Sequence, residues 1–375
     1  MAKQANAKKI GIVLNTAWNI VNFRLGLIKQ LIADGHEVVA IAPADEYVPQ
    51  IEALGARFLA LNQLERKGSN PLREMKLCRE LYKVFKQERL DLVLLYTIKP
   101  NIYGALAAKW AGIPSICTVT GLGYTFLHDN MVSKLAQRLY KYAFKRASWV
   151  AFQNRDDRQL FIDRGLVAQE KSLLIPGSGI NTQVFAPVAG REEPAVFTFL
   201  FVGRLLKDKG VNELLEAARQ LQQAQAEAQI WVVGAMDRDN PACISAETLA
   251  QAQALGNLQY FGRSDKVKDF IGRADVVVLP SYREGLPRVM LEALAMGKAV
   301  LTTEVAGCRE TVEEGQNGFM VPAKDANALA KAMLKMYKLP QAALEKMGAK
   351  GREMALEHFD EQIIIQHYKQ LIKEL

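Results

Sequence analysis

The chain has 375 residues, of which 50% are hydrophobic and 23% charged, and its net charge is +8. This length predicts two domains of an ordinary globular protein. No stretch is apolar enough to span a membrane and no signal-peptide pattern is present, so we expect a cytoplasmic protein. The charge favours anionic ligands or an anionic membrane surface, and the known nucleic-acid-binding motifs are absent.

The first half of the sequence alternates short apolar runs with helical patterns. This alternation predicts βαβ units and a parallel sheet. The expected strands are residues 9–14, 37–42, 91–96, 115–119, 149–152 and 172–175. The expected helices are residues 23–34, 47–54 and 101–111.

The same pattern restarts after a Pro- and Gly-containing charged joint at residues 187–194. The expected strands of the second half are residues 197–202, 229–233, 276–279 and 298–302, with a helix at 211–227. The sequence therefore predicts an α/β protein with two doubly wound, Rossmann-like domains that face each other across a cleft. We place the first domain at residues 1–187 and the second at residues 188–359.

Two carboxylates flank a Gly-Leu-Pro turn that follows the apolar run 276–279. Glu284 is expected in the loop after that strand, and Glu292 in the helix that Pro287 opens. Open α/β sheets bind ligands at the carboxyl ends of their strands, and the amides of Gly285 and Leu286 favour a phosphate there. The pair suits a sugar nucleotide, although two glutamates eight residues apart are also a common accident, and most glutamates on helices are solvated.

A basic loop follows the first strand of the second half. Gly203 permits a close turn, and Arg204 and Lys209 then offer a guanidinium fork and an ammonium charge for phosphate oxygens. Taken alone, this loop is more typical of a solvated surface. Because no Walker loop and no GxGxxG motif is present, an NTPase or a dinucleotide enzyme is not supported.

Together these segments resemble the family 4 glycosyltransferases, which have the GT-B fold and retain anomeric configuration. The matching segments are Gly203-Arg-Leu, Lys209-Gly, Gly262-Arg-Ser-Asp, Leu279-Pro-Ser-Tyr-Arg-Glu-Gly-Leu-Pro with Glu292, and Glu313-Glu-Gly-Gln-Asn-Gly-Phe. The first half matches more loosely, through its strand order and Pro176-Gly-Ser-Gly-Ile. The resemblance implies acceptor binding by the first domain, donor binding by the second, and a last helix, 360–375, that packs back on the first.

The resemblance also implies roles for single residues. Arg204 and Lys209 would hold the donor diphosphate, Glu284 the hydroxyls of the transferred sugar, and Glu292 the ribose. Further donor contacts would come from Gly203, Arg263, Ser264, Gly285, Leu286 and Asn15. In this family the acceptor is thought to attack the face from which the diphosphate leaves. We therefore expect neither a carboxylate nucleophile, nor a metal, nor a cofactor.

Two segments depart from the common family pattern. Many relatives have a Gly-Gly loop where this chain reads Asn15-Thr-Ala-Trp-Asn, and a histidine where it reads Thr118-Val-Thr-Gly-Leu-Gly-Tyr. With Asn22-Phe-Arg, both variants resemble the branch that extends polyprenyl-diphosphate-linked glycans in protein glycosylation or in O-antigen and capsule synthesis. The implied reaction moves a sugar such as an N-acetylhexosamine from a UDP-sugar to an undecaprenyl-diphosphate-linked saccharide. Candidate acceptor contacts are Lys99, Asn101, Thr120, Gly121 and Tyr124.

A lipid-linked acceptor calls for contact with the membrane surface. Residues 131–146 have helical period, and a basic amphipathic helix can lie on anionic lipid. Its cations are Lys134, Arg138, Lys141, Lys145 and Arg146. A core-facing helix with a solvated basic face is an equally good interpretation. We expect a peripheral protein on the inner face of the membrane.

Two other functions remain open on the sequence alone. A non-hydrolysing UDP-sugar epimerase has the same architecture, but it needs acid and base groups, and few histidines are present. A non-catalytic sugar-nucleotide-binding protein is the other alternative, against which the complete set of Arg204, Lys209, Glu284 and Glu292 argues. The reaction product separates all three.

Overall fold

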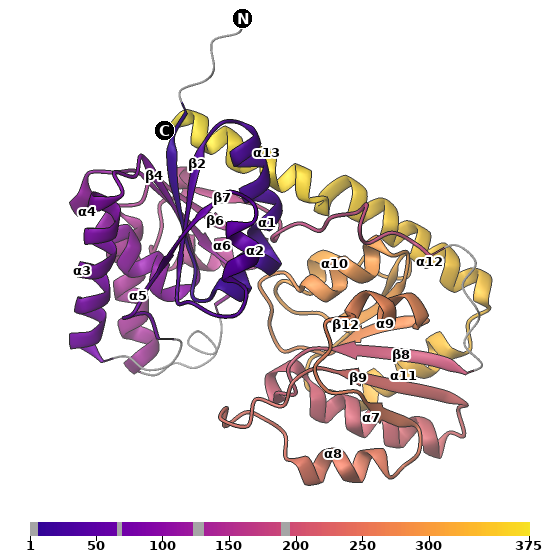
Figure 1. Cartoon of the computed structure of the whole chain (residues 1–375). Coiled ribbons are helices and arrows are strands. Elements are labelled where there is room, and N and C mark those ends of the chain that lie inside the picture. Colours follow the sequence, from indigo (N-terminus) through magenta and orange to yellow (C-terminus); the bar gives the residue numbers. More distant parts are fainter. Residues whose placement is uncertain (1–6, 66–69, 123–130, 189–195) are drawn as a thin grey trace, which may run out of the picture. The chain divides into compact units, whose positions relative to one another are not determined.

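The computed structural model describes residues 7–65, 70–122, 131–188 and 196–375, and Figure 1 traces its helices and strands. The chain forms two compact units: unit 1 is Met1–Ser178 with Glu361–Leu375, and unit 2 is Gly179–Asp360. Each unit contains one parallel sheet with helices on its faces. The predicted pair of doubly wound α/β domains is confirmed.

Unit 1 contains a seven-stranded sheet in the order β3-β2-β1-β4-β5-β6-β7. Its strands are β1 (Lys9–Val13), β2 (Glu37–Ala42), β3 (Arg57–Ala60), β4 (Leu92–Tyr96), β5 (Ser115–Val119), β6 (Trp149–Phe152) and β7 (Ser172–Leu174). All pairs are parallel, and most strands read as unbroken buried apolar runs because helices cover both faces. The strand order reverses between β1 and β4, which is where such sheets bind ligands.

Helices form a layer on each face of this sheet. Their bounds are α1 (Ala17–Ala33), α2 (Val48–Glu52), α3 (Pro71–Gln87), the π-helical turn η1 (Pro100–Gly104), α4 (Ala105–Ala111), α5 (Met131–Phe144), α6 (Arg155–Asp163), the 3₁₀ turn η3 (Gln169–Lys171) and α13 (Glu361–Glu374). One core joins the sheet to α3, α4, α5 and α6. A second core joins its other face to α1, α2 and α13.

Helix α1 begins six residues before the predicted start at residue 23, at Ala17. The reason is a cap: the Thr16 side chain accepts a hydrogen bond from the amide of Asn19 at 3.0 Å, which satisfies one of the free donors at a helix start. The helix therefore begins shortly after β1 ends, and its first turn lies at the carboxyl ends of the strands.

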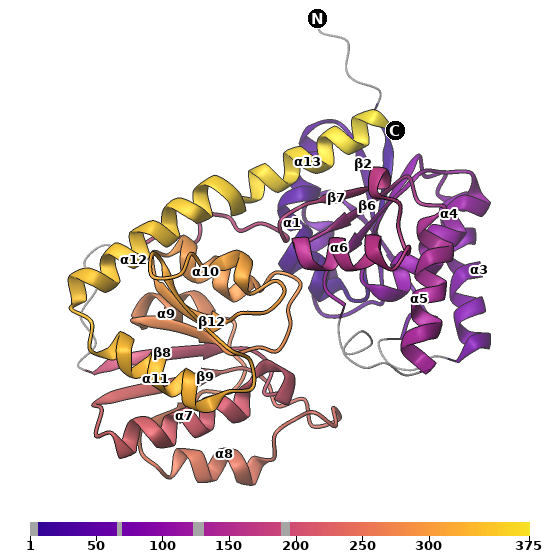
Figure 2. The ribbon, with the colours of Figure 1, turned by 180° about the vertical axis from the view of Figure 1, so that it is seen from behind.

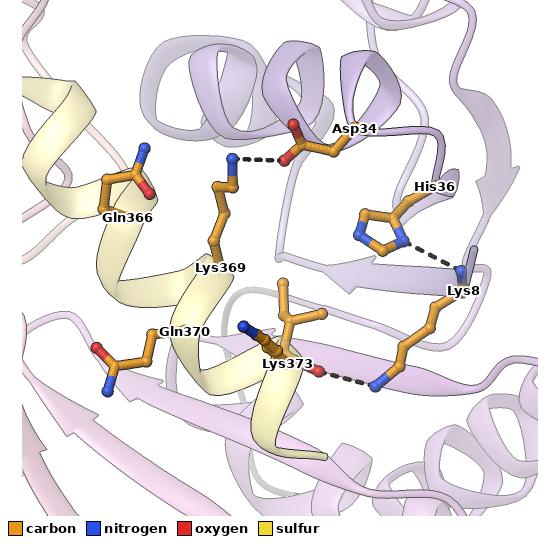
Figure 3. Close-up of a pocket in the computed structure, with 8 residues that line it drawn as sticks. Lys8, Asp34, His36, Gln366, Lys369, Gln370 and Lys373 are labelled. Carbon is orange, nitrogen blue, oxygen red and sulfur yellow. Dashed lines mark hydrogen bonds and ion pairs between the residues drawn. The ribbon is translucent and has the colours of Figure 1, made fainter. Parts of the chain in front are cut away.

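The last helix, α13, is anchored to unit 1 by polar contacts around a pocket of about 750 Å³ (Figure 3). The Lys8 ammonium donates to the carbonyl of Ile372 at 2.8 Å, and Lys369 forms an ion pair with Asp34 at 2.9 Å. The Lys8 amide donates to Nδ1 of His36 at 3.0 Å. Since α1 and α13 both end here, these lysines meet the carbonyl-rich, negative ends of two helices. Their charge is thus compensated by the fold itself.

Unit 2 contains a six-stranded parallel sheet in the order β10-β9-β8-β11-β12-β13. The strands are β8 (Phe197–Val202), β9 (Ala228–Val233), β10 (Leu258–Tyr260), β11 (Val276–Leu279), β12 (Ala299–Thr303) and β13 (Gly318–Val321). The helices and turns are η4 (Lys207–Lys209), α7 (Val211–Gln223), α8 (Ala246–Gln253), α9 (Val267–Arg273), α10 (Arg288–Ala295), η5 (Arg309–Thr311), α11 (Ala326–Tyr337), α12 (Gln341–Met354) and η6 (Ala355–Phe359). Here the order reverses between β8 and β11.

The boundary between the units differs from the predicted boundary at residue 187. It lies after Ser178, because the segment that follows is bonded to the end of unit 2. The Ile180 amide donates to the carbonyl of Phe359 at 2.8 Å, and Arg352 donates to the carbonyls of Thr182 and Phe185 at 3.0 Å.

Candidate active site

The loops after β8 and β11 meet at the carboxyl edge of the unit 2 sheet. The chain leaves β8 through Gly203, forms the 3₁₀ turn η4 and enters α7. At Gly210 the φ angle is +70°, and an added Cβ would lie 2.0 Å from the carbonyl oxygen of Pro280. Only glycine fits such a position without strain. It lets the turn that carries Lys209 pack directly against the start of the loop that carries Glu284.

Lys209 and Glu284, 75 residues apart in the chain, form an ion pair at 2.5 Å. The Ser281 hydroxyl donates to the same carboxylate oxygen, Oε1, at 2.7 Å. Both side chains are largely shielded, with 19% of Lys209 and 15% of Glu284 exposed. Among the residues that the structure describes, none donates to the other oxygen, Oε2. The arrangement thus fixes the carboxylate and leaves one acceptor oxygen for a ligand hydroxyl.

The backbone of Glu284 is fixed from a third loop. Its amide donates to the carbonyl of Ala306 at 3.1 Å. Gly307, with φ of +78°, lies so close that a Cβ there would be 2.4 Å from the Glu284 carbonyl oxygen and 2.5 Å from that of Gly285. The Gly285–Leu286 turn is therefore held between the β11 and β12 loops, just before α10 begins.

Glu292 occupies a more enclosed position than Glu284. It lies in α10, is 8% exposed, and accepts a hydrogen bond from Nε of Arg288, one turn earlier, at 2.8 Å. Burial raises the pKa of this carboxyl, and the Arg288 charge opposes that rise. The predicted contact with ribose would therefore be made by a carboxylate that Arg288 helps to keep charged.

The remaining cations of the donor candidates lie at the surface. Arg204 is 47% exposed and reaches Asp237 only at 3.4 Å, so its guanidinium has room to reorient toward an anion. Arg263 is 57% exposed and 4.0 Å from Asp265, and the Ser264 hydroxyl accepts from the Lys266 amide. These two residues follow the edge strand β10, which two strands separate from β11.

The acceptor candidates and the donor candidate Asn15 follow neighbouring strands of unit 1. Asn15 follows β1 and binds Asn19, Lys99 follows β4 and pairs with Glu74 at 2.7 Å, and Thr120 and Gly121 follow β5. Asn101 is fully buried and donates to the Thr118 carbonyl at 2.8 Å, so its amide nitrogen is committed to the sheet edge. Tyr124 lies outside the described residues.

Two residues at the carboxyl ends of these strands carry signs of function: the sequence analysis did not single out Thr97, and it quoted Arg24 only as part of a segment and gave it no role. Thr97, directly after β4, has φ of +67°, a conformation that is costly for a β-branched side chain and is concentrated at functional sites. Arg24 is 3% exposed and stacks 4.1 Å above the Tyr96 ring. In the same way, Ser281 and Arg288 support Glu284 and Glu292. Their spacing of three and four residues from those carboxylates is the signal that could have found them.

No helix within the described ranges is long and apolar enough to cross a membrane. No group of three His, Cys, Asp or Glu residues there could hold a metal ion.

Both halves of the chain match known sequence families. Residues 189–354 match the glycosyl transferases group 1 family, and residues 20–177 match the glycosyl transferase 4-like domain. The chain is 31% identical to the N,N'-diacetylbacillosaminyl-diphospho-undecaprenol alpha-1,3-N-acetylgalactosaminyltransferase of Campylobacter jejuni, over 97% of this chain and 98% of that protein. The chain belongs to the group 1 glycosyltransferases. The present chain is also 25% identical to the UDP-Gal:alpha-D-GlcNAc-diphosphoundecaprenol alpha-1,3-galactosyltransferase of Escherichia coli, over 71% of each chain.

Solved structures agree with the architecture of the transferase. HepE of Anabaena, in complex with UDP and glucose, has a TM-score of 0.82 at 18% identity over 98% of this chain and 100% of that one. The sucrose-phosphate synthase of Thermosynechococcus elongatus has a TM-score of 0.81 at 22% identity, covering 98% and 99%. At these identities the likeness concerns the fold. The predicted GT-B fold, family and enzyme class are confirmed, and the roles of single residues stay predictions.

Proposed function

We propose that the transferase moves a sugar from a UDP-sugar donor to a saccharide on a polyprenyl-diphosphate carrier. The observation that carries the proposal is the Lys209–Glu284 pair at the point where the unit 2 sheet reverses its order. A carboxylate with one acceptor oxygen left for a hydroxyl, beside an ammonium group, suits a molecule that is both sugar and phosphate. The names of the Campylobacter and E. coli relatives support an undecaprenol-linked acceptor and, for the second, a UDP-sugar donor.

The proposed mechanism relies on charge stabilisation. As the bond between sugar and diphosphate breaks, negative charge grows on the diphosphate, and Lys209 and Arg204 would neutralise it. Glu284 would hold a hydroxyl of the transferred sugar, and Glu292 a ribose hydroxyl. The acceptor would attack the face from which UDP leaves, so that the configuration is retained without a covalent intermediate on the protein and without a metal.

In this mechanism, donor binding changes the partners of Lys209 and Glu284. Before the donor binds, Lys209 is neutralised by Glu284. A diphosphate beside Lys209 would share that ammonium group, while the sugar hydroxyl takes Oε2 of the same carboxylate. Ser281 keeps Oε1 in place during this exchange. Glu284 is thus expected to act as a fixed acceptor and not as a proton carrier.

On the acceptor side, we propose contacts at the carboxyl edge of the unit 1 sheet and attachment to the inner face of the membrane through α5. The outer face of α5 exposes Lys134, Arg138 and Lys141, with Leu135 and Tyr142 each 54% exposed, and Lys145 is exposed in the turn directly after the helix. Arg146 stacks on the Tyr142 ring at 3.4 Å. The opposite face, with Tyr140 and Phe144, is buried in the core, so the helix both packs and presents a basic amphipathic surface.

The decisive experiment is a transfer assay on short-chain prenyl-diphosphate saccharides with a panel of UDP-sugars, UDP-N-acetylhexosamines included, and product analysis. Formation of an elongated, α-linked product supports the proposal. An isomerised donor without transfer would indicate the epimerase, and donor binding without any product would indicate a sensor. Melting curves guide the choice of donor, since a ligand at 100 times its Kd stabilises by about 2.7 kcal/mol.

A further inference from the structure

Helix α3 presents an exposed basic stripe that no part of the proposed function uses. Lys76, Arg79, Lys83 and Lys86 are all exposed, and their spacing of three, four and three residues places them along one side of the helix. Within the described chain, none of the four forms an ion pair. The opposite side of α3 is buried through Leu77, Cys78, Leu81 and Phe85.

The two acidic residues of α3 do not neutralise this stripe. Glu74 is buried and paired with Lys99 at 2.7 Å. Glu80 accepts hydrogen bonds from the amides of Asn62 and Gln63. Glu80 keeps its negative charge beside Lys76 and Lys83, but one carboxylate against four cations leaves the stripe with a net positive charge that faces outward.

Apolar side chains are exposed beside these cations. Leu72 and Met75, in the first turns of α3, are 66% and 47% exposed. Exposed large hydrophobic side chains in the described residues number twelve, and six of them lie on α3, α4 and α5. The six are Leu72, Met75, Trp110, Met131, Leu135 and Tyr142. Such a concentration on three helices is more than the scattered exposure found on any protein surface.

These three helices form one continuous face of unit 1. Helices α3 and α5 both pack against η1, and α4 continues from it. Figures 1 and 2 show α3, α4 and α5 side by side over the same face of the sheet. The helix that carries the stripe and the helix that carries the basic surface of α5 are therefore neighbours in the same layer.

We infer that α3 is a second lipid-binding helix, and that the outer face of α3, α4 and α5 docks as a unit on an anionic phospholipid bilayer. Cations close to anionic headgroups contribute electrostatic attraction, while leucine, methionine and tryptophan side chains enter the boundary with the acyl chains. A nucleic acid would satisfy the cations but would leave Leu72 and Met75 in water. The inference deepens the membrane attachment proposed above for α5 and rests on it, but lipid binding can be measured without sugar transfer.

The test measures partition of the full chain onto vesicles of phosphatidylglycerol and phosphatidylcholine at low salt. The variant carries Lys76→Gln, Arg79→Gln, Lys83→Gln and Lys86→Gln. A basic residue at an anionic surface changes partition about fivefold, which is ~1 kcal/mol converted at 1.4 kcal/mol per factor of ten. We expect the partition coefficient to fall at least about tenfold, and pure phosphatidylcholine vesicles to bind neither protein.

A matched control removes the same charge elsewhere. It carries Lys268→Gln, Lys331→Gln, Lys338→Gln and Lys346→Gln, which replace four exposed lysines of unit 2, and it should bind the vesicles as the unchanged protein does. A second variant, Leu72→Ser with Met75→Ser, should weaken the part of the binding that persists at high salt. Unchanged melting temperatures establish that all variants fold.

Two results would overturn the inference. One is an α3 variant that binds as tightly as the unchanged protein, and the other is a unit 2 control that loses as much binding as the α3 variant. Transfer to a soluble short-chain acceptor reports separately on the proposed function. Activity without vesicle binding would remove the docking face alone, whereas α3-dependent vesicle binding without activity would remove the proposed donor and acceptor alone.

Discussion

Replacement of Lys209 by alanine is expected to lower kcat/KM for transfer by about 10- to 200-fold. The side chain makes one short charged contact, at 2.5 Å to Glu284, in a site where both partners are mostly shielded from water. A hydrogen bond to a charged group contributes about 1.5–3 kcal/mol, and each 1.36 kcal/mol is a factor of ten in rate. The Lys209→Ala variant would lose that contribution to the stabilisation of the leaving diphosphate. Its Glu284 carboxylate would keep only the Ser281 hydroxyl as a hydrogen-bond partner.

The chain supplies a control on the same turn. Lys207 lies two residues earlier in η4 and is exposed, so Lys207→Ala should keep kcat/KM within about twofold. The assay is initial-rate transfer at varied UDP-sugar concentration with Lys209→Ala, Glu284→Gln and the double variant. Groups in direct contact should couple by about 0.5–3 kcal/mol. Full activity of Lys209→Ala, or strictly additive effects in the double variant, would refute the assigned roles.

Three further predictions concern the fold, the pH response and the chemistry. Gly307→Ala should lower the free energy of unfolding, measured by urea denaturation, by more than about 2 kcal/mol, because the new Cβ would clash with the Glu284 backbone and the positive φ would be strained. The control Gly256→Ala has φ of +85° but open space around it, so it should cost about 1 kcal/mol. Burial lowers the pKa of His36. The charge of Asp34 opposes this shift, and the charges of nearby lysines add to it. The unfolded chain then binds more protons below about pH 6.5, so stability should be full above that pH and fall as pH drops through the folded-state pKa. The His36→Asn variant should flatten the fall in urea midpoints. Turnover should survive EDTA, and a loss that magnesium or manganese restores would contradict the metal-free mechanism.

The sequence predicts the donor half of the site better than it predicts the contacts inside it. The apolar run before Glu284 and the Gly-Leu-Pro turn are local signals, so the strand–loop–helix unit β11–α10 follows from them. The same rule places Lys209 at the same edge of a sheet. That Lys209 and Glu284 touch depends on β8 and β11 being neighbours, and strand order is a property of the whole sheet.

Other elements were missed for identifiable reasons. Helix α3 was not predicted, although Asn70 caps its first turn by accepting from the Leu72 amide and Pro71 follows, a common pair at a helix start. Strand β3 is four residues long and only partly buried, so its apolar signal is weak. The ion pair between Lys99 and buried Glu74 joins two separate helical segments, and no spacing rule connects them.

The path of the chain through the two units has a practical consequence. Unit 2 is an insertion: the chain leaves unit 1 after Ser178 and re-enters it at Glu361, so a polypeptide cut at one point cannot yield two complete halves. Ile180 and Asp360 pair as a parallel bridge, which puts the outgoing and returning segments next to each other. Unit 1 could therefore be produced by itself as a single excision variant, with Ser178 joined to α13 through a short glycine linker. Simple C-terminal truncation would instead remove Ile364, Tyr368 and Ile372 from its core.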